Sequence, residues 1–155
     1  MVVVKTSKDS HFPHFPNIEV LMVTHHTALI YTMVLVSAAD GDMTDAELTV
    51  IGDFIRTLPV FKDYDAKLLT QAAADCAAFL SADDGFETVL DIIGQALPDR
   101  LRETAYALAC DVAAADMSTD QEELRLLEML RNHLEIDPLV TAAIERAARA
   151  RHATA

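Results

Sequence analysis

The sequence contains no tryptophan, and aromatic residues make up only 6% of its 155 residues. Glycine and proline are also scarce, with four and five occurrences. Because β-sheets favour β-branched and aromatic side chains, this composition argues against a fold built mainly of sheets. Alanine and leucine dominate instead, and both are strong helix formers. With 52% apolar residues and enough length to bury a sizeable core, the chain is predicted to form one all-α domain.

Basic residues are few: 12 lysines and arginines stand against 25 aspartates and glutamates, for a net charge of -13. Such a negative surface repels phosphate backbones, so we expect no nucleic-acid binding. Cations, or a basic patch on a protein partner, are its natural counterparts. Acidic enrichment also serves solubility alone, so charge by itself assigns no function.

Cysteine is nearly absent, because only Cys76 and Cys110 occur and they form no Cys-x-x-Cys pair. Both lie in alanine-rich stretches without a basic neighbour, which is typical of buried, unreactive thiols. Free thiols also suit a reducing compartment. We therefore expect two buried free cysteines in a cytoplasmic protein.

Long apolar runs are limited to one, from Leu21 to Ala39, and the first five residues lack the order of a signal peptide. This run contains His25, His26 and three threonines, and it leads directly into an acidic turn. A buried central helix fits those residues better than a membrane span. We expect no direct span.

Seven helices are predicted from apolar spacing and from start and stop signals. Residues 1–16 precede this single helical domain, 17–155, as an extended arm, because Pro13 and Pro16 exclude a continuous helix. His11 and His14 of the arm could hold a metal, but packing of the arm's phenylalanines on the body is the simpler interpretation. The helices are expected at about residues 18–39, 44–58, 65–80, 86–97, 99–115, 120–134 and 137–151.

Capping signals open several of these helices. Segment 44–47 has the form of a capping box, and segment 120–123 repeats it. Pro59 stops the second helix and Asp65 caps the third, while Asp137-Pro138 is a cap followed by proline at the first helical position. Apolar spacing places three leucines of the third, sixth and seventh helices toward the core, namely Leu68, Leu124 and Leu139.

An internal repeat organises the chain. Ala38-Ala39-Asp40 aligns with Ala114-Ala115-Asp116, and seven residues after each aspartate Glu47 aligns with Glu123. The repeat predicts a bundle-like domain of two three-helix units, related by a pseudo-two-fold axis, plus one connecting helix. The units cover about residues 20–80 and 99–152.

The repeated acidic turns are the candidate site. Asp40 follows the end of a long helix, where carbonyl groups and the helix dipole disfavour a carboxylate unless a cation or a hydrogen-bond donor meets it. Asp40, Asp42 and Glu47 could supply hard oxygen ligands to Ca²⁺ or Mg²⁺, with Zn²⁺ as a third possibility. Asp116 and Glu123 would form the second copy, which lacks both the glycine and the second aspartate.

A purely structural interpretation is the simpler one on the residues alone. Asp40 can accept hydrogen bonds from the amides that open the next helix, and Gly41 can supply a positive φ. Glu47 and Glu123 are then capping-box acids. The protein would be a metal-independent helical scaffold or adaptor that binds a protein partner through its helix faces.

Enzymatic signatures are missing from the sequence. It contains no Glu-x-x-His pair, no HExxH or GxSxG motif and no P-loop. His25 and His26 lie about 100° apart on their helix, so at most one faces the core as a satisfied histidine. We expect a protein without catalytic residues.

Segment 38–48, with its Ala-Asp-Gly turn and a glutamate seven residues after the aspartate, resembles the signature of the tellurite-resistance TerB family. Segment 114–124 is a second, degenerate copy with Met117 where glycine is expected. The resemblance covers about residues 20–150. It implies an all-helical repeated fold, an acidic surface, and a non-enzymatic cytoplasmic role in tellurite or stress resistance.

The resemblance also indicates partners. It implies metal-dependent assemblies with other stress-resistance proteins, membrane-embedded ones among them. A homodimer is compatible with the same sequence features.

Overall fold

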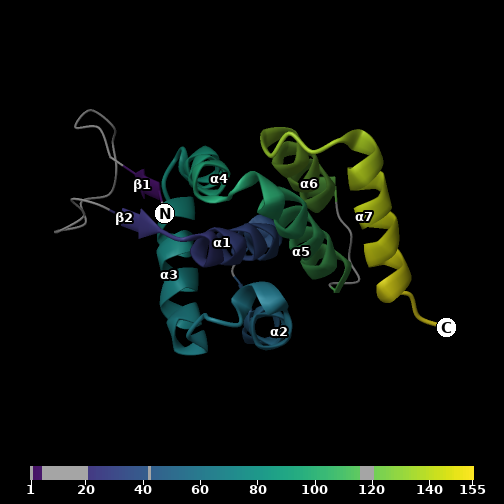
Figure 1. Ribbon diagram of the computed structural model, residues 1–155, viewed down its shortest axis with the longest axis horizontal. Coiled ribbons are helices and arrows are strands. Elements are labelled where there is room, and N and C mark those ends of the chain that lie inside the picture. Colours follow the sequence, from purple (N-terminus) through teal and green to yellow (C-terminus); the bar gives the residue numbers. More distant parts are fainter. Residues whose placement is uncertain (1, 5–20, 42, 116–120) are drawn as a thin grey trace.

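The computed structural model describes residues 2–4, 21–41, 43–115 and 121–155 of the chain (Figure 1). In these ranges the fold is all-α with seven α-helices, as predicted, and one two-stranded antiparallel hairpin. The strands and helices are β1 Val2–Val4, β2 Leu21–Val23, α1 His25–Ser37, α2 Asp45–Thr57, α3 Leu69–Leu80, α4 Gly85–Ala96, α5 Arg102–Ala115, α6 Gln121–His133 and α7 Pro138–Arg151. Four 3₁₀ turns join them: η1 Ala38–Asp40, η2 Pro59–Phe61, η3 Ala66–Leu68 and η4 Asp99–Leu101.

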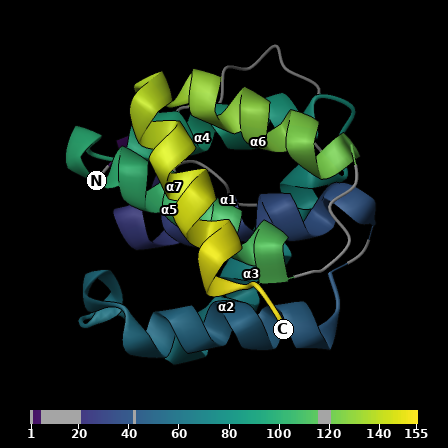
Figure 2. The same ribbon diagram turned by 90° about the vertical axis from the view of Figure 1, so that its right-hand side faces the viewer.

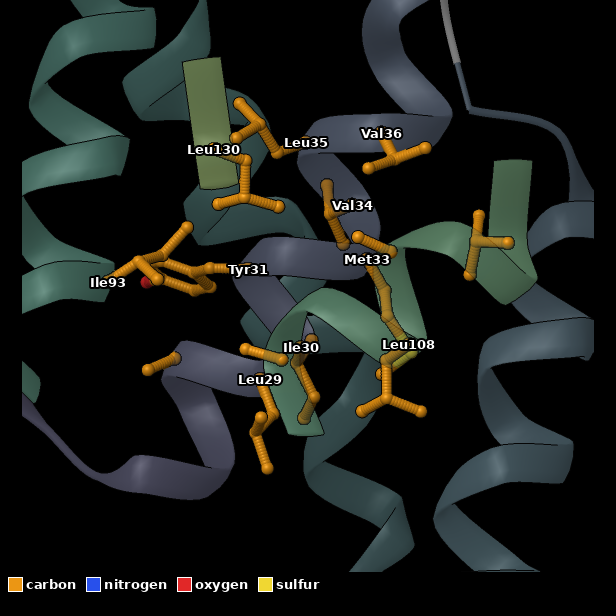
Figure 3. Close-up of a cluster of buried hydrophobic side chains, with 14 of the residues drawn as sticks. Leu29, Ile30, Tyr31, Met33, Val34, Leu35, Val36, Ile93, Leu108 and Leu130 are labelled. Carbon is orange, nitrogen blue, oxygen red and sulfur yellow. The ribbon is translucent and has the colours of Figure 1, made fainter. Parts of the chain in front are cut away.

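Helix α1 is the core of the molecule, and every residue from Ala28 to Ser37 is buried. It packs against α3, α4 and α5. Its side chains project to different sides, where Ile93 of α4, Leu108 of α5 and Leu130 of α6 belong to the same cluster (Figure 3). A helix that is apolar all round must be buried all round. The predicted central buried helix is therefore confirmed.

The start of that helix differs from the prediction. Residues 21–23 form strand β2, which pairs with β1 in the register Val2↔Val23, and α1 begins only after Thr24. The Thr24 Oγ1 accepts a hydrogen bond from the Thr27 N–H at 3.2 Å and caps the helix. The predicted start at residue 18 was wrong at residues 21–24, because β-branched and apolar residues also suit a strand once a partner strand exists.

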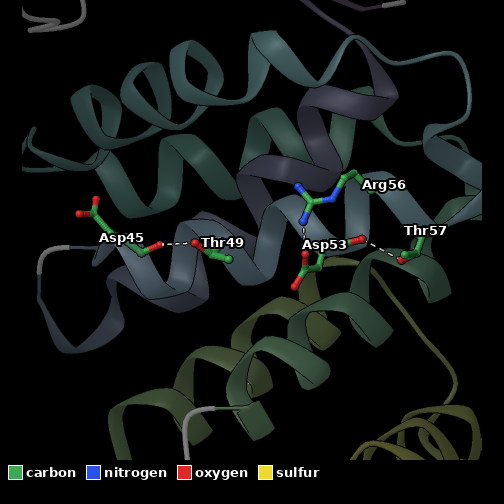
Figure 4. A network of polar contacts seen from close by, with 5 residues as sticks. All are labelled: Asp45, Thr49, Asp53, Arg56 and Thr57. Carbon is green, nitrogen blue, oxygen red and sulfur yellow. Dashed lines mark hydrogen bonds and ion pairs between the residues drawn. The ribbon is translucent and has the colours of Figure 1, made fainter.

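Helix α2 has one core face and one polar face. Ile51 and Ile55 are buried, and Thr49, Asp53 and Thr57 lie outside. On this outer face the hydroxyls of Thr49 and Thr57 donate to carbonyls four residues earlier, and Arg56 forms an ion pair with Asp53 (Figure 4). The helix ends before Pro59, as predicted.

The predicted caps are present at three helices. Thr44 and Glu47 form a capping box at α2, and the Asp65 and Asp137 carboxylates accept from the N–H groups of Lys67 and Leu139 at 3.0 and 2.8 Å. Each cap satisfies backbone donors that the first helical turn leaves open.

The predicted burial of three leucines was wrong. Leu68, Leu124 and Leu139 are 54%, 55% and 82% exposed. Leu68 lies in η3, whose tighter 3₁₀ winding rotates it away from the face that α3 presents to α1. Helix α7 packs mainly on α5 and buries Thr141 and Ala148, which places Leu139 outside.

Two further expectations concern the cysteines and the arm. Cys76 and Cys110 are both buried and free, as predicted. The segment His11-Phe12-Pro13-His14-Phe15-Pro16 lies outside the described residues.

None of the helices in the described part of the chain has the length and apolar character that crossing a membrane requires.

Candidate functional site

The first acidic turn follows directly from the end of α1. The chain tightens into η1, and the Gly41 N–H donates to the Ala38 carbonyl at 3.2 Å. Gly41 has φ of +134°, a conformation that residues with a Cβ rarely adopt. A Cβ added there would meet no atom within 4 Å. The backbone conformation, rather than lack of space, therefore requires glycine at this position.

Glu47 closes the capping box at the start of α2. Its Oε2 accepts from the Thr44 N–H at 2.6 Å and from the Thr44 hydroxyl at 3.0 Å. The Glu47 N–H in turn donates to Thr44 Oγ1 at 3.3 Å. One carboxylate oxygen of Glu47 thus has a structural role, which confirms the capping interpretation for this residue.

The second acidic turn lies between α5 and α6. Asp116 and the expected cap Asp120 belong to residues 116–120, which lie outside the described residues. Glu123, in the first turn of α6, is buried and only 3% exposed. Glu47 at the aligned position of α2 is half-buried. The two aligned glutamates therefore have different environments.

The fold places the first turn beside the helix that follows the second turn in the sequence. Helices α2 and α6 lie on opposite sides of α1, and both begin on the side of the molecule where α1 ends (Figure 2). The 3₁₀ turn η1 packs against α6. Ala38 and Ala39 of η1 share a cavity wall with Glu122 and Leu126 of α6. The first turn therefore lies beside the helix that carries Glu123.

Metal binding by the five predicted ligands stays a prediction. Asp42 and Asp116 lie outside the described residues, and Asp40 is described through its backbone only. Within the described ranges, no three His, Cys, Asp or Glu side chains gather as metal ligands. The donors themselves are hard carboxylate oxygens, which suit Ca²⁺ and Mg²⁺.

Histidines 25 and 26 behave as packed side chains. The His26 Nε2–H donates to the Val60 carbonyl at 2.8 Å, and its ring lies 5.7 Å from that of Phe61. Burial, followed by the adjacent His26, lowers the pKa of His25. His26 is half-buried and hydrogen-bonded, which agrees with the expectation that a histidine facing inward is satisfied.

A polar network that sequence reasoning missed links α5, α6 and α7. The Tyr106 hydroxyl and the Arg131 guanidinium both donate to Glu145 Oε1, at 2.6 and 3.0 Å. Burial, followed by the hydrogen bond to Glu145, raises the pKa of Tyr106. No local motif joins residues so far apart in the sequence. The network therefore becomes visible only once the three helices are packed.

Comparison with known proteins identifies the family. The chain matches the family model described as tellurite resistance protein TerB over residues 26–147. No curated protein and no solved structure matches the chain. TerB is not a known family of enzymes. The match extends over most of the chain, from the second residue of α1 into α7. This protein belongs to the TerB family of tellurite-resistance proteins.

Proposed function

We propose that this protein is a non-enzymatic interaction protein of tellurite or stress resistance that binds a divalent cation at its acidic turns. Asp40, Asp42 and Glu47 would supply one group of ligands, and Asp116 and Glu123 the other. Family membership supports the link to tellurite resistance. The net charge of -13 supports a cationic ligand or a basic partner surface.

One structural observation carries the metal proposal. The turn η1, which ends at Asp40, packs against α6, whose first turn holds the buried Glu123. Two sequence-distant acidic segments are thereby brought into one region. A cation between them would offset both the carboxylates and the negative end of the α1 dipole.

The ligand chemistry favours Ca²⁺ or Mg²⁺. All five residues offer carboxylate oxygens, and the carbonyl groups at the end of α1 could complete the shell. Zn²⁺ usually takes nitrogen or sulfur ligands. Cys76 and Cys110 are buried elsewhere in α3 and α5, so Zn²⁺ is the least favoured of the three ions.

A melting titration tests the proposal. Wild type and Asp40→Asn are freed of metal with a chelator and then titrated with Ca²⁺, Mg²⁺ and Zn²⁺. Binding to the folded state alone adds about 2.7 kcal/mol at 100 times the dissociation constant. For a domain of this size the melting temperature then rises by about 5–10 °C. Asp40→Asn should weaken the rise.

The matched control is Asp83→Asn, which removes the same charge from an exposed residue of the α3–α4 turn. It should leave the ion response unchanged. The metal proposal would be contradicted if no ion raised the melting temperature of wild type. It would also be contradicted if Asp83→Asn reduced the ion-dependent rise as much as Asp40→Asn does.

The metal-independent adaptor is a second candidate, favoured by the surface of α6. Leu124 and Met129 are 55% and 36% exposed there. Met129 borders a cavity of about 380 Å³ that also contacts η1 and α4. If the acidic turns are only caps, Asp40→Asn should lower the melting temperature equally with and without divalent ions. The same titration therefore separates the two candidates.

A further inference from the structure

A second candidate site lies at the opposite end of α1 from the acidic turns. A cavity of about 430 Å³ opens between the first half of α1, the first half of α3 and the segment that joins η2 to η3. Three aspartates and two tyrosines line it, and no lysine or arginine does. These residues are Asp63, Asp65, Asp75, Tyr31 and Tyr64.

Packed rings hold one wall of this cavity in place. The Tyr64 ring lies 5.3 Å from His26 and 6.0 Å from Phe61, and His26 is anchored by its hydrogen bond to the Val60 carbonyl. Phe61 itself is only 2% exposed. Tyr64 therefore presents an ordered aromatic surface, and such surfaces attract cations.

Tyr31 forms part of the inner wall. Its side chain is 1% exposed, and its hydroxyl makes no hydrogen bond with any residue that the structure describes. Burial, followed by the nearby Cys76, Asp75 and Tyr64, raises the pKa of Tyr31. Tyr31 itself lines the cavity, together with Asp75 and Tyr64. A buried phenol oxygen there offers a hydrogen-bond acceptor to an occupant.

The carboxylates at this cavity are positioned but not neutralised. Asp75 Oδ1 accepts from the Gln71 amide at 2.8 Å, and Asp65 Oδ1 accepts from the Lys67 N–H at 3.0 Å. Among the described residues, none of the three aspartates forms an ion pair. The cavity thus combines negative charge, an acceptor hydroxyl and an aromatic face.

We propose that this cavity binds a primary ammonium group on a short alkyl chain. The carboxylate of Asp75 and the hydroxyl of Tyr31 would accept the N–H groups, and the Tyr64 ring would cover the charge. The buried Val23 and Ala72 give the alkyl chain an apolar wall. A metal ion fits less well, because part of the wall is aromatic and no metal-ligand group occurs among the described residues.

This inference is independent of the proposed cation at the acidic turns, because it uses other residues at the other end of α1. The ammonium group has two possible sources, a free amine or the side chain of a lysine. Both present the same chemistry to the cavity, so the experiment compares them directly.

The test is an NMR titration of the full chain at constant ionic strength with n-propylammonium chloride and with Nα-acetyl-lysine methylamide. We expect saturable shifts confined to amides of segments 24–31 and 63–75, with a dissociation constant on the order of 1 mM. The tighter of the two ligands identifies the source. Neutral n-propanol should give no saturation in this range.

Three variants sharpen the test. Asp75→Asn keeps an acceptor for Gln71 but removes the charge, and should weaken binding about fivefold. Tyr31→Phe should weaken it about threefold by removing the hydroxyl. Asp83→Asn, with the same change of net charge outside the cavity, should bind as wild type does. Equal weakening by Asp83→Asn, equal binding of n-propanol, or no saturation with either amine would each overturn the proposal.

Discussion

The two predicted repeat units differ most in how deeply their parts are buried. In the first unit, α1 is buried along ten consecutive residues, and α4 covers it together with α3. In the second unit, α5 packs on α1 and α7, and α7 leaves Leu139 82% exposed. Position in the assembled core, more than the repeated motif, therefore decides how each helix is buried.

The contacts between helices nevertheless follow one scheme. Helix α1 packs on α3 as α5 packs on α7, and α1 packs on α5 across the middle. Helix α2 contacts both α1 and α5, and so does α6. The predicted pseudo-two-fold relation is compatible with this scheme and stays a prediction. The connecting helix α4 contacts α1 and α3 of the first unit and, less extensively, α6 of the second unit.

The aligned glutamates Glu47 and Glu123 also differ in burial between the two units. Glu47 is half-buried and bonded to Thr44, whereas Glu123 is 3% exposed. Burying a carboxylate is costly unless its surroundings stabilise the charge. Conserving the residue type between the repeats does not conserve its environment.

The largest expected effect is the difference in lost stability between a leucine-to-alanine substitution in α1 and the same substitution in α7. Leu29→Ala, at a residue that is 0% exposed, should cost about 2–5 kcal/mol of unfolding free energy through lost burial and a cavity. Leu139→Ala should stay within about 0.5 kcal/mol, because Leu139 is already in solvent. Urea unfolding followed by circular dichroism measures both. Equal losses would refute the difference in burial between the two helices.

The second prediction compares the glutamates. Glu123→Gln should cost about 1–3 kcal/mol, because it changes a charged group in a buried setting. Glu47→Gln should cost less than about 0.5 kcal/mol, since glutamine also serves at this position of a capping box. Both are measured by urea unfolding in the presence of a chelator. A larger loss for Glu47→Gln would reverse the comparison.

A third prediction concerns Gly41, because the first acidic turn contains this glycine and the aligned second turn has none. Gly41→Ala should cost about 1–2 kcal/mol, because a side chain at φ of +134° is strained. Gly52→Ala is the control, since Gly52 lies inside α2 and its added Cβ would make ordinary contacts with Arg56 and with Leu69 of α3. It should be neutral or stabilising by up to about 1 kcal/mol. In thermal melts, the melting temperature should therefore fall in Gly41→Ala and stay equal or rise in Gly52→Ala.

A fourth prediction concerns a feature that both units share, the two buried cysteines. Burial raises the pKa of both Cys76 in α3 and Cys110 in α5 to about 12, from an ordinary value of 9.0. The folded state therefore keeps the thiol proton that the unfolded state loses, and stability should fall as pH rises from about 9 toward 12. Urea midpoints at pH 8 and pH 10.5 measure this fall.

Matched variants then test its cause. Cys76→Ala and Cys110→Ala should each reduce the dependence of the urea midpoint on pH above 9. Thiol reagents should also react slowly with the folded wild type at pH 8. Fast modification of either cysteine without unfolding would contradict its burial.

Much of the fold could be predicted because its signals are local. The capping box of Thr44 and Glu47, the caps Asp65 and Asp137, and the stop at Pro59 act within one helical turn. The all-apolar run in α1 predicts burial by itself. These features depend on neighbours in sequence, so the sequence was sufficient to find them.

The predictions were wrong where contacts between segments distant in the sequence determine the local structure. Leu21–Val23 is a strand because Val2–Val4 pairs with it, and a short apolar run does not distinguish strand from helix without its partner. Leu139 lies outside because α7 rests mainly on α5. Apolar spacing predicts that a helix has a core face, but the packing partner decides which residues lie on it.

The sequence by itself determined the helical class, most helix ends, the buried thiols and the family, because propensity, capping and motif spacing are properties of short segments. Only the tertiary structure decided that η1 lies against α6, that Glu123 is buried while Glu47 is not, and that Tyr31, Tyr64 and Asp75 share one cavity. These relations join residues far apart in the chain, and packing of the whole core creates them.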